Sequence, residues 1–226
     1  MQWYLTQIKD LQNVRITHLK LNCDSEEIKI LDRILGLQCK KRNLLFSHHF
    51  IQIMPWRVNS LTPHILSAVE HIVRYSGIGY KEVVISTVGD RRLFEALLKS
   101  EIKPALAISL HSAMDEKRRS LLPRAADLTV KEILEYGAKY AEVGKYPIQY
   151  QWTLVNGIND GIDEIEALTP LWSRQAILNM IPVNAVDGSP YRRPSTEQID
   201  KIKEACRANG ILLKSVSYTH LTLPTK

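Results

Sequence analysis

Polar side chains stand at the ends of three apolar segments of the chain. "EVVIST" ends on Ser86 and Thr87, "ALAISLH" ends on Ser109 and His111 around one leucine, and "LNMIPVN" ends on Asn184. Hydroxyl, imidazole and amide groups can bind the polar groups of a small ligand. If these segments are parallel strands, their carboxyl ends lie at one edge, and the side chains should face one shared cavity. The alternative for His111 is a purely structural role.

From residue 49 onward, short β-branched or apolar runs alternate with amphipathic segments of helical spacing. This alternation predicts an α/β fold with a parallel sheet, either barrel-like or doubly wound. Residues 1–45 show no clear pattern. The expected strands cover 49–54, 82–87, 105–110, 148–155, 176–181 and 211–215, and the expected helices cover 62–75, 90–100, 128–143, 163–172 and 195–210.

Residues at the helix ends support these boundaries. Asp90 and Ser195 are suitable N-cap residues, and Gly210 is suitable for closing the last helix. Thr129 stands three residues before Glu132, which is the spacing of a capping box.

Length and composition restrict the class of protein. The chain has 226 residues, 45% of them hydrophobic, which is enough for a domain with a real core. It has no apolar run of the roughly 18 residues that span a bilayer and no secretory signal at its start, so we expect a cytoplasmic protein. The net charge of +6 is compatible with a nucleic-acid partner.

Four stretches occur in an order and at a spacing that are specific to one enzyme family. They are "STVG", "LAISLHS" followed by "DE" and "LLP", "LVNGIND", and "LNMIPVNAVDGSPYRRPSTEQIDKIKEACRANGI". Through them, residues 82–214 resemble the C-terminal half of the radical S-adenosylmethionine (SAM) methyltransferases that modify adenine C2 in large-subunit ribosomal RNA. The resemblance implies a partial (β/α)6 radical-SAM-type barrel with parallel strands.

The resemblance also implies a cofactor site, a metal cluster and a partner. In the intact family the cofactors are S-adenosylmethionine and a 4Fe-4S cluster, and the partner is RNA, ribosomal or transfer. The positions that match the S-adenosylmethionine contacts are Ser86, Ser109, Leu110, His111 and Asn184.

The cysteines depart from the family pattern. A 4Fe-4S cluster of this kind needs three cysteines spaced Cys-x3-Cys-x2-Cys, which leave one iron open for the cofactor. The chain has only Cys23, Cys39 and Cys206, far apart, so we expect no metal ligands among them and no stable cluster. The centre of the family's Gly-Glu-Pro region, here Met54 to Ser60, is also altered between well-matched flanks. Frame slips in the underlying DNA and true degeneration both explain this pattern.

The last residues do not match the family either. The segment "VSYTHLTLPT", Val216 to Thr225, corresponds to a translated sequencing adapter in one frame, and the family's C-terminal methyl-carrying cysteine is absent. We therefore expect residues 1–215 to form a single partial barrel, with 1–45 poorly defined, and 216–226 to be an artefactual tail.

The sequence favours a truncated radical SAM enzyme of the ribosomal RNA (adenine-C2) methyltransferase group, inactive as written, and leaves methyl transfer or another radical reaction open. The first alternative is a non-catalytic α/β barrel that binds a nucleotide or RNA. An aldolase-like barrel is disfavoured, because no lysine stands at a strand end. The basic residues available for phosphate contacts are Arg91, Arg92, Lys117, Arg118, Arg119, Arg124, Arg192 and Arg193.

Overall fold

The structure is a computed structural model. It describes residues 18–22, 50–54, 66–67, 69–70, 73–74, 79–123, 125, 128–184 and 189–215. The chain divides into two compact units, Met1–Ile85 and Ser86–Lys226. The prediction of one barrel over 1–215 stays a prediction, and the expected tail at 216–226 lies outside the described residues.

The first unit contains short parallel strands. Strand β1 (His18–Asn22) pairs with β2 (Phe50–Met54), and β2 pairs in parallel with β3 (Val83–Thr87), whose last two residues belong to the second unit. A single 3-10 turn, η2 (Tyr80–Glu82), leads into β3. The sequence predicted β2 and β3 within one residue but gave no sign of β1.

The second unit is built on a parallel sheet. Strand β4 (Ala105–Ser109) pairs with β5 (Ile148–Leu154), β5 pairs with β6 (Ala176–Pro182), and β6 pairs with β7 (Leu213–Ser215). All three pairings are parallel, which confirms the α/β class with parallel strands. The helices are α3 (Arg91–Lys99), α4 (Asp115–Leu121), α5 (Val130–Gly144), α6 (Ile162–Leu168) and α7 (Thr196–Ala208), and the 3-10 turn η3 (Thr169–Leu171) extends α6.

The predicted helix caps are confirmed. The Asp90 carboxylate accepts hydrogen bonds from the backbone N–H groups of Arg92 and Leu93. Thr129 and Glu132 form the predicted capping box at the start of α5, and the Ser195 hydroxyl caps α7. Each cap satisfies backbone donors that an α-helix leaves unpaired in its first turn, so these residues fix where the helices begin.

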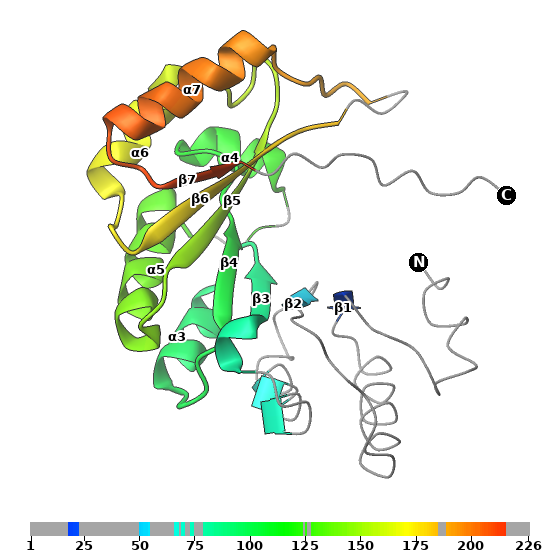
Figure 1. The fold of residues 1–226 in the computed structure, drawn as a ribbon, viewed down its shortest axis with the longest axis vertical. Coiled ribbons are helices and arrows are strands. Elements are labelled where there is room, and N and C mark those ends of the chain that lie inside the picture. Colours follow the sequence, from blue (N-terminus) through cyan, green and yellow to red (C-terminus); the bar gives the residue numbers. More distant parts are fainter. Residues whose placement is uncertain are drawn as a thin grey trace, which may run out of the picture. The chain divides into compact units, whose positions relative to one another are not determined.

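Helices cover one face of the sheet formed by β4–β7 (Figure 1). On that face, β5 presents Ile148, Tyr150, Trp152 and Leu154, which are at most 1% exposed. This burial of apolar side chains beneath α5, α6 and α7 is the main stabilising contribution in the second unit. None of the helices within the described ranges is long and apolar enough to span a lipid bilayer.

Candidate functional site

The predicted site residues lie at the carboxyl ends of their strands. Ser86 is the fourth residue of β3, and Ser109 is the last residue of β4. Leu110 and His111 follow β4 directly, and Asn184 is two residues beyond β6. Because β4, β5 and β6 are parallel, the residues from β4 and β6 lie along the same edge of the sheet.

Hydrogen bonds hold neighbouring strand ends together. The Arg118 guanidinium donates to the carbonyl oxygens of Val88 and Ser109, the latter at 3.2 Å, and so joins the segments at the ends of β3 and β4. On the other side, the backbone N–H of Val183 donates to the Leu154 carbonyl at 2.9 Å. The edge that carries the predicted residues is therefore a connected structure.

His111 turns the chain at this edge. Its φ angle is +61°, in the left-handed region, so the extended strand does not continue from Ser109 to His111. The imidazole Nδ1 accepts a hydrogen bond of 2.9 Å from the backbone N–H of Thr153 in β5. His111 thus has a structural role, which was the alternative considered for it in the sequence. This role leaves its second ring nitrogen, Nε2, free to bind a ligand.

The His111 ring is neutral at physiological pH. Burial, with a smaller contribution from the positive charge of Arg118, lowers the pKa of His111 to about 4. Because Nδ1 accepts the bond from Thr153, the neutral ring carries its proton on Nε2 and can donate one hydrogen bond to a ligand. Burial also lowers the pKa of Arg118 to about 10, which leaves that guanidinium charged at neutral pH.

This shift predicts that stability falls at acid pH. The folded-state pKa of His111 is about 4, below the unfolded value of 6.5, so the unfolded state binds the proton first as the pH falls. We expect the contribution of His111 to be complete above pH 6.5 and to decrease by up to about 3 kcal/mol on approaching pH 4. Urea unfolding of the wild type and of His111→Gln, between pH 7 and pH 4.5, measures it. An equally steep pH dependence in His111→Gln would contradict the assignment.

Two buried polar side chains hold the loops around His111. Asn159, 1% exposed, donates from Nδ2 to the carbonyls of His111 at 2.6 Å and Thr153 at 2.8 Å, and its Oδ1 accepts from the Val155 N–H at 2.7 Å. The other side chain is Glu164 of α6, which is fully buried.

The Glu164 carboxylate fixes the loop that follows His111. It accepts hydrogen bonds from the Ser112 hydroxyl at 2.9 Å and the Ala113 N–H at 2.7 Å, and it pairs with Lys117 Nζ at 3.1 Å. Buried polar groups are stable only when they are hydrogen-bonded, and each of these carboxylate oxygens has partners. Asn159 and Glu164 therefore position the segment that carries three of the predicted contact residues.

A row of polar side chains runs along the sheet face opposite the buried aromatic residues. In β5 it comprises Gln149, Gln151 and Thr153, which alternate with the buried positions and are partly exposed. Residues paired in register share a face, so Ser109 lies beside Gln151 and Asn179 lies on its other side. The sequence analysis missed this row, although the alternation in "IQYQWTL" is the signal of a strand with one polar face.

Asn179 has an unsatisfied group in this row. The residue is 6% exposed, and its Nδ2 donates to Gln149 Oε1 at 3.0 Å. Its Oδ1 is buried and has no hydrogen-bond partner among the described residues. A buried acceptor without a hydrogen bond lowers the stability of the fold by about 1–3 kcal/mol, so a donor at this oxygen would be stabilising.

The described residues provide no cluster ligands. No group of three His, Cys, Asp or Glu side chains in the described ranges could hold a metal ion. Cys206 lies buried in α7, and burial raises the pKa of its thiol to about 11, so the thiolate form that binds iron is disfavoured. Cys23 and Cys39 lie outside the described residues.

Relatives share sequence with this chain over about two thirds of its length. A probable RNA methyltransferase of Pseudomonas aeruginosa is 47% identical over 152 residues, which are 67% of this chain and 44% of that protein. A probable RNA methyltransferase of Bordetella avium is 46% identical over 152 residues, 67% of this chain and 43% of that protein. The chain thus spans less than half the length of these relatives. No protein-family model matches it.

Solved structures share its fold. A radical SAM methyltransferase from Sphaerobacter thermophilus matches with a TM-score of 0.66 at 22% identity, over 85% of this chain and 57% of the other. A domain of a pyruvate-formate lyase-activating enzyme from Bacteroides vulgatus matches with a TM-score of 0.51 at 17% identity, over 71% of this chain and 96% of the other. These similarities concern the fold alone, and they agree with the α/β class with parallel strands that the sequence predicted.

Proposed function

We propose that this chain, which resembles radical SAM RNA methyltransferases in sequence and fold, is the part of such an enzyme that holds S-adenosylmethionine. The cofactor binds at the carboxyl edge of the sheet. Its contacts come from Ser86, Ser109, Leu110, His111 and Asn184.

The proposal is supported by the position of Ser109, Leu110, His111 and Asn184 at or just beyond the carboxyl ends of the parallel strands β4 and β6. S-adenosylmethionine offers an amino group, a carboxylate, two ribose hydroxyls and an adenine edge, and so needs both donors and acceptors. His111 offers its Nε2–H as a donor, and the hydroxyls of Ser86 and Ser109 at the strand ends can both donate and accept. The residues present therefore fit the organic cofactor.

The same residues do not fit a 4Fe-4S cluster. In intact relatives that cluster supplies the electron that cleaves S-adenosylmethionine, and it requires thiolates close together. Cys206 is buried inside α7, and the sequence lacks a Cys-x3-Cys-x2-Cys triplet. We derive no reaction step through a cluster, and we expect the chain as written to bind the cofactor without turning it over.

The substrate class follows from the relatives. Relatives named probable RNA methyltransferase support RNA as the substrate of the complete enzyme. Ribosomal or transfer RNA, modified in the cytoplasm, is the finer proposal, and it rests on the resemblance of the sequence. Reaction at adenine C2 is the finer form of this proposal, and it rests on the four sequence stretches quoted above.

One observation favours the non-catalytic alternative, a nucleotide- or RNA-binding barrel. That observation is the lack of a Cys-x3-Cys-x2-Cys triplet in the sequence. Without a cluster, the cofactor edge would serve as a binding site for a nucleoside. Such a binder would not distinguish S-adenosylmethionine from adenosine, because the methionine end would make no contacts.

Replacing Asn184 by alanine tests the cofactor site. Asn184 is exposed, so its loss should leave the melting temperature nearly unchanged. We expect the dissociation constant for S-adenosylmethionine to rise about five- to tenfold, the worth of one or two hydrogen bonds. Isothermal titration calorimetry on the 226-residue chain measures this change.

Asn209→Ala is the matched control. Asn209 follows α7, just before β7 begins, and so lies at the amino edge of the sheet. Its replacement should not affect cofactor affinity. Equal affinity in the wild type and Asn184→Ala contradicts the site, and equal affinity of the wild type for adenosine and S-adenosylmethionine supports the non-catalytic binder instead.

A further inference from the structure

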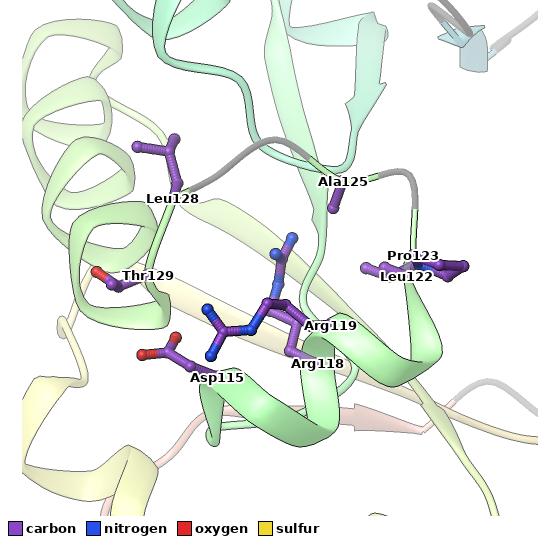
Figure 2. A pocket seen from close by; sticks show the side chains of 8 residues that line it. All are labelled: Asp115, Arg118, Arg119, Leu122, Pro123, Ala125, Leu128 and Thr129. Atoms are coloured by element: carbon purple, nitrogen blue, oxygen red, sulfur yellow. The ribbon is translucent and has the colours of Figure 1, made fainter.

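A cavity of about 300 Å³ lies between α4 and the start of α5. Figure 2 shows its lining, with the side chains of Arg118 and Arg119 extending from α4 into the space between α4 and the loop that leads to α5. The lining residues are Asp115, Arg118, Arg119, Leu122, Pro123, Ala125, Leu128 and Thr129.

Arg118 brings a buried and incompletely compensated positive charge to this cavity. It is 2% exposed, its hydrogen bonds go to the neutral carbonyls of Val88 and Ser109, and its Nε has no partner among the described residues. A buried cation is costly unless an anion compensates it. Burial has the largest effect on the pKa of Arg118 and lowers it, and among the described residues Asp115 is the acidic group that opposes this shift.

Arg119 brings a second charge that is available to a ligand. Its side chain is exposed, and in the part of the chain that the structure describes it makes no hydrogen bond or ion pair. The cavity also borders the N-terminus of α5, a helix of 15 residues, where the helix dipole favours negative charge.

The Asp115 carboxylate does not cancel these charges. Its Oδ1 accepts a hydrogen bond of 2.7 Å from the Val130 N–H, which joins α4 to the first turn of α5. Two guanidinium groups therefore face one carboxylate that is already engaged. The described residues that line the cavity carry a net positive charge, and the cavity has room for a small anion.

We infer that this cavity binds a phosphodiester group of the RNA substrate, with Arg119 as the contact residue and Arg118 as the buried charge behind it. The inference rests on the proposed function. Arg118 bonds to the carbonyl of Ser109, so the cavity adjoins the edge where we place the cofactor. When a target base of RNA reaches that edge, the phosphate backbone next to the base lies close to the cavity. Arginine is well suited to bind phosphate oxygens.

Arg119→Gln tests the inference, because it removes one charge without disturbing buried contacts. Fluorescence anisotropy with a single-stranded, adenine-containing RNA of 12 nucleotides gives the dissociation constant at several salt concentrations. We expect binding to weaken about three- to tenfold at 0.1 M salt, and the slope of log affinity against log salt to decrease by about one. Arg207→Gln, an exposed position in the last turn of α7, is the control and should leave both quantities unchanged.

The outcomes separate this inference from the cofactor proposal. S-adenosylmethionine affinity should be the same in Arg119→Gln and the wild type, whereas Asn184→Ala changes it. Unchanged RNA affinity and salt slope in Arg119→Gln, or no RNA binding by the wild type, overturns the phosphate site and leaves the cofactor site standing. A third outcome would assign the cavity to a free anion and overturn the RNA contact. In that outcome, millimolar inorganic phosphate stabilises the wild type but not Arg119→Gln, and the two proteins bind RNA with equal affinity.

Discussion

Replacing Asn159 by alanine lowers the free energy of unfolding by about 3 kcal/mol, because it leaves one buried N–H and two partly buried carbonyls without their partner. Those groups belong to Val155, His111 and Thr153. The same substitution releases the backbone of His111, so S-adenosylmethionine should also bind more weakly. Urea denaturation and calorimetric titration measure the two effects separately.

Asn156→Ala is the matched control for Asn159. Asn156 lies three residues earlier in the same loop, and its side chain is exposed. Its replacement should change stability by less than about 0.5 kcal/mol and leave cofactor affinity unaltered. If Asn159→Ala behaved like Asn156→Ala, the proposed support of the His111 backbone would be wrong.

Replacing Glu164 by alanine also costs about 4 kcal/mol, since it removes a fully buried carboxylate on which a hydroxyl, a backbone N–H and a lysine depend. The partly buried N–H of Ala113 would lose its acceptor, and the hydroxyl of Ser112 would keep only the Met114 carbonyl, at 3.3 Å. Lys117 is 35% exposed at its side chain, so it can turn to water or to Asp163 and contributes least. Thermal or urea unfolding of the full chain measures the loss.

Two further substitutions in α6 test whether the lower stability of Glu164→Ala comes from its buried carboxylate. Glu164→Gln keeps the shape and one acceptor oxygen, so we expect a smaller cost than for alanine. Glu166→Ala removes an exposed carboxylate from the same helix and should be nearly neutral. Similar stabilities for Glu164→Ala and Glu166→Ala would refute the buried network.

Local patterns predicted the elements well, because helix caps and strand periodicity depend on neighbouring residues. The alternation in "IQYQWTL" and the pair Thr129 and Glu132 are signals of this kind, and β5 and α5 begin within two residues of the expected positions. The strand-end positions of Ser109 and Asn184 followed from the same reasoning.

Non-local contacts could not be read from the sequence. Asn159 lies in a stretch typical of a turn, yet its partner His111 is 48 residues away and is brought close only by the pairing of β4 with β5. Glu164 stands among acidic neighbours in "DEIE" and has the pattern of an exposed helix position. Its burial depends on Ser112, 52 residues earlier in the chain.

The left-handed backbone of His111 has a consequence for which substitutions evolution can accept there. A β-carbon in that conformation costs about 1 kcal/mol that glycine would avoid, and asparagine tolerates it better than most residues. The His111 ring offsets this cost, because its Nδ1 accepts the hydrogen bond from the Thr153 N–H, which glycine could not do. Folding therefore favours a side chain with an acceptor at this position, and asparagine is the replacement that we expect to be tolerated best in homologues.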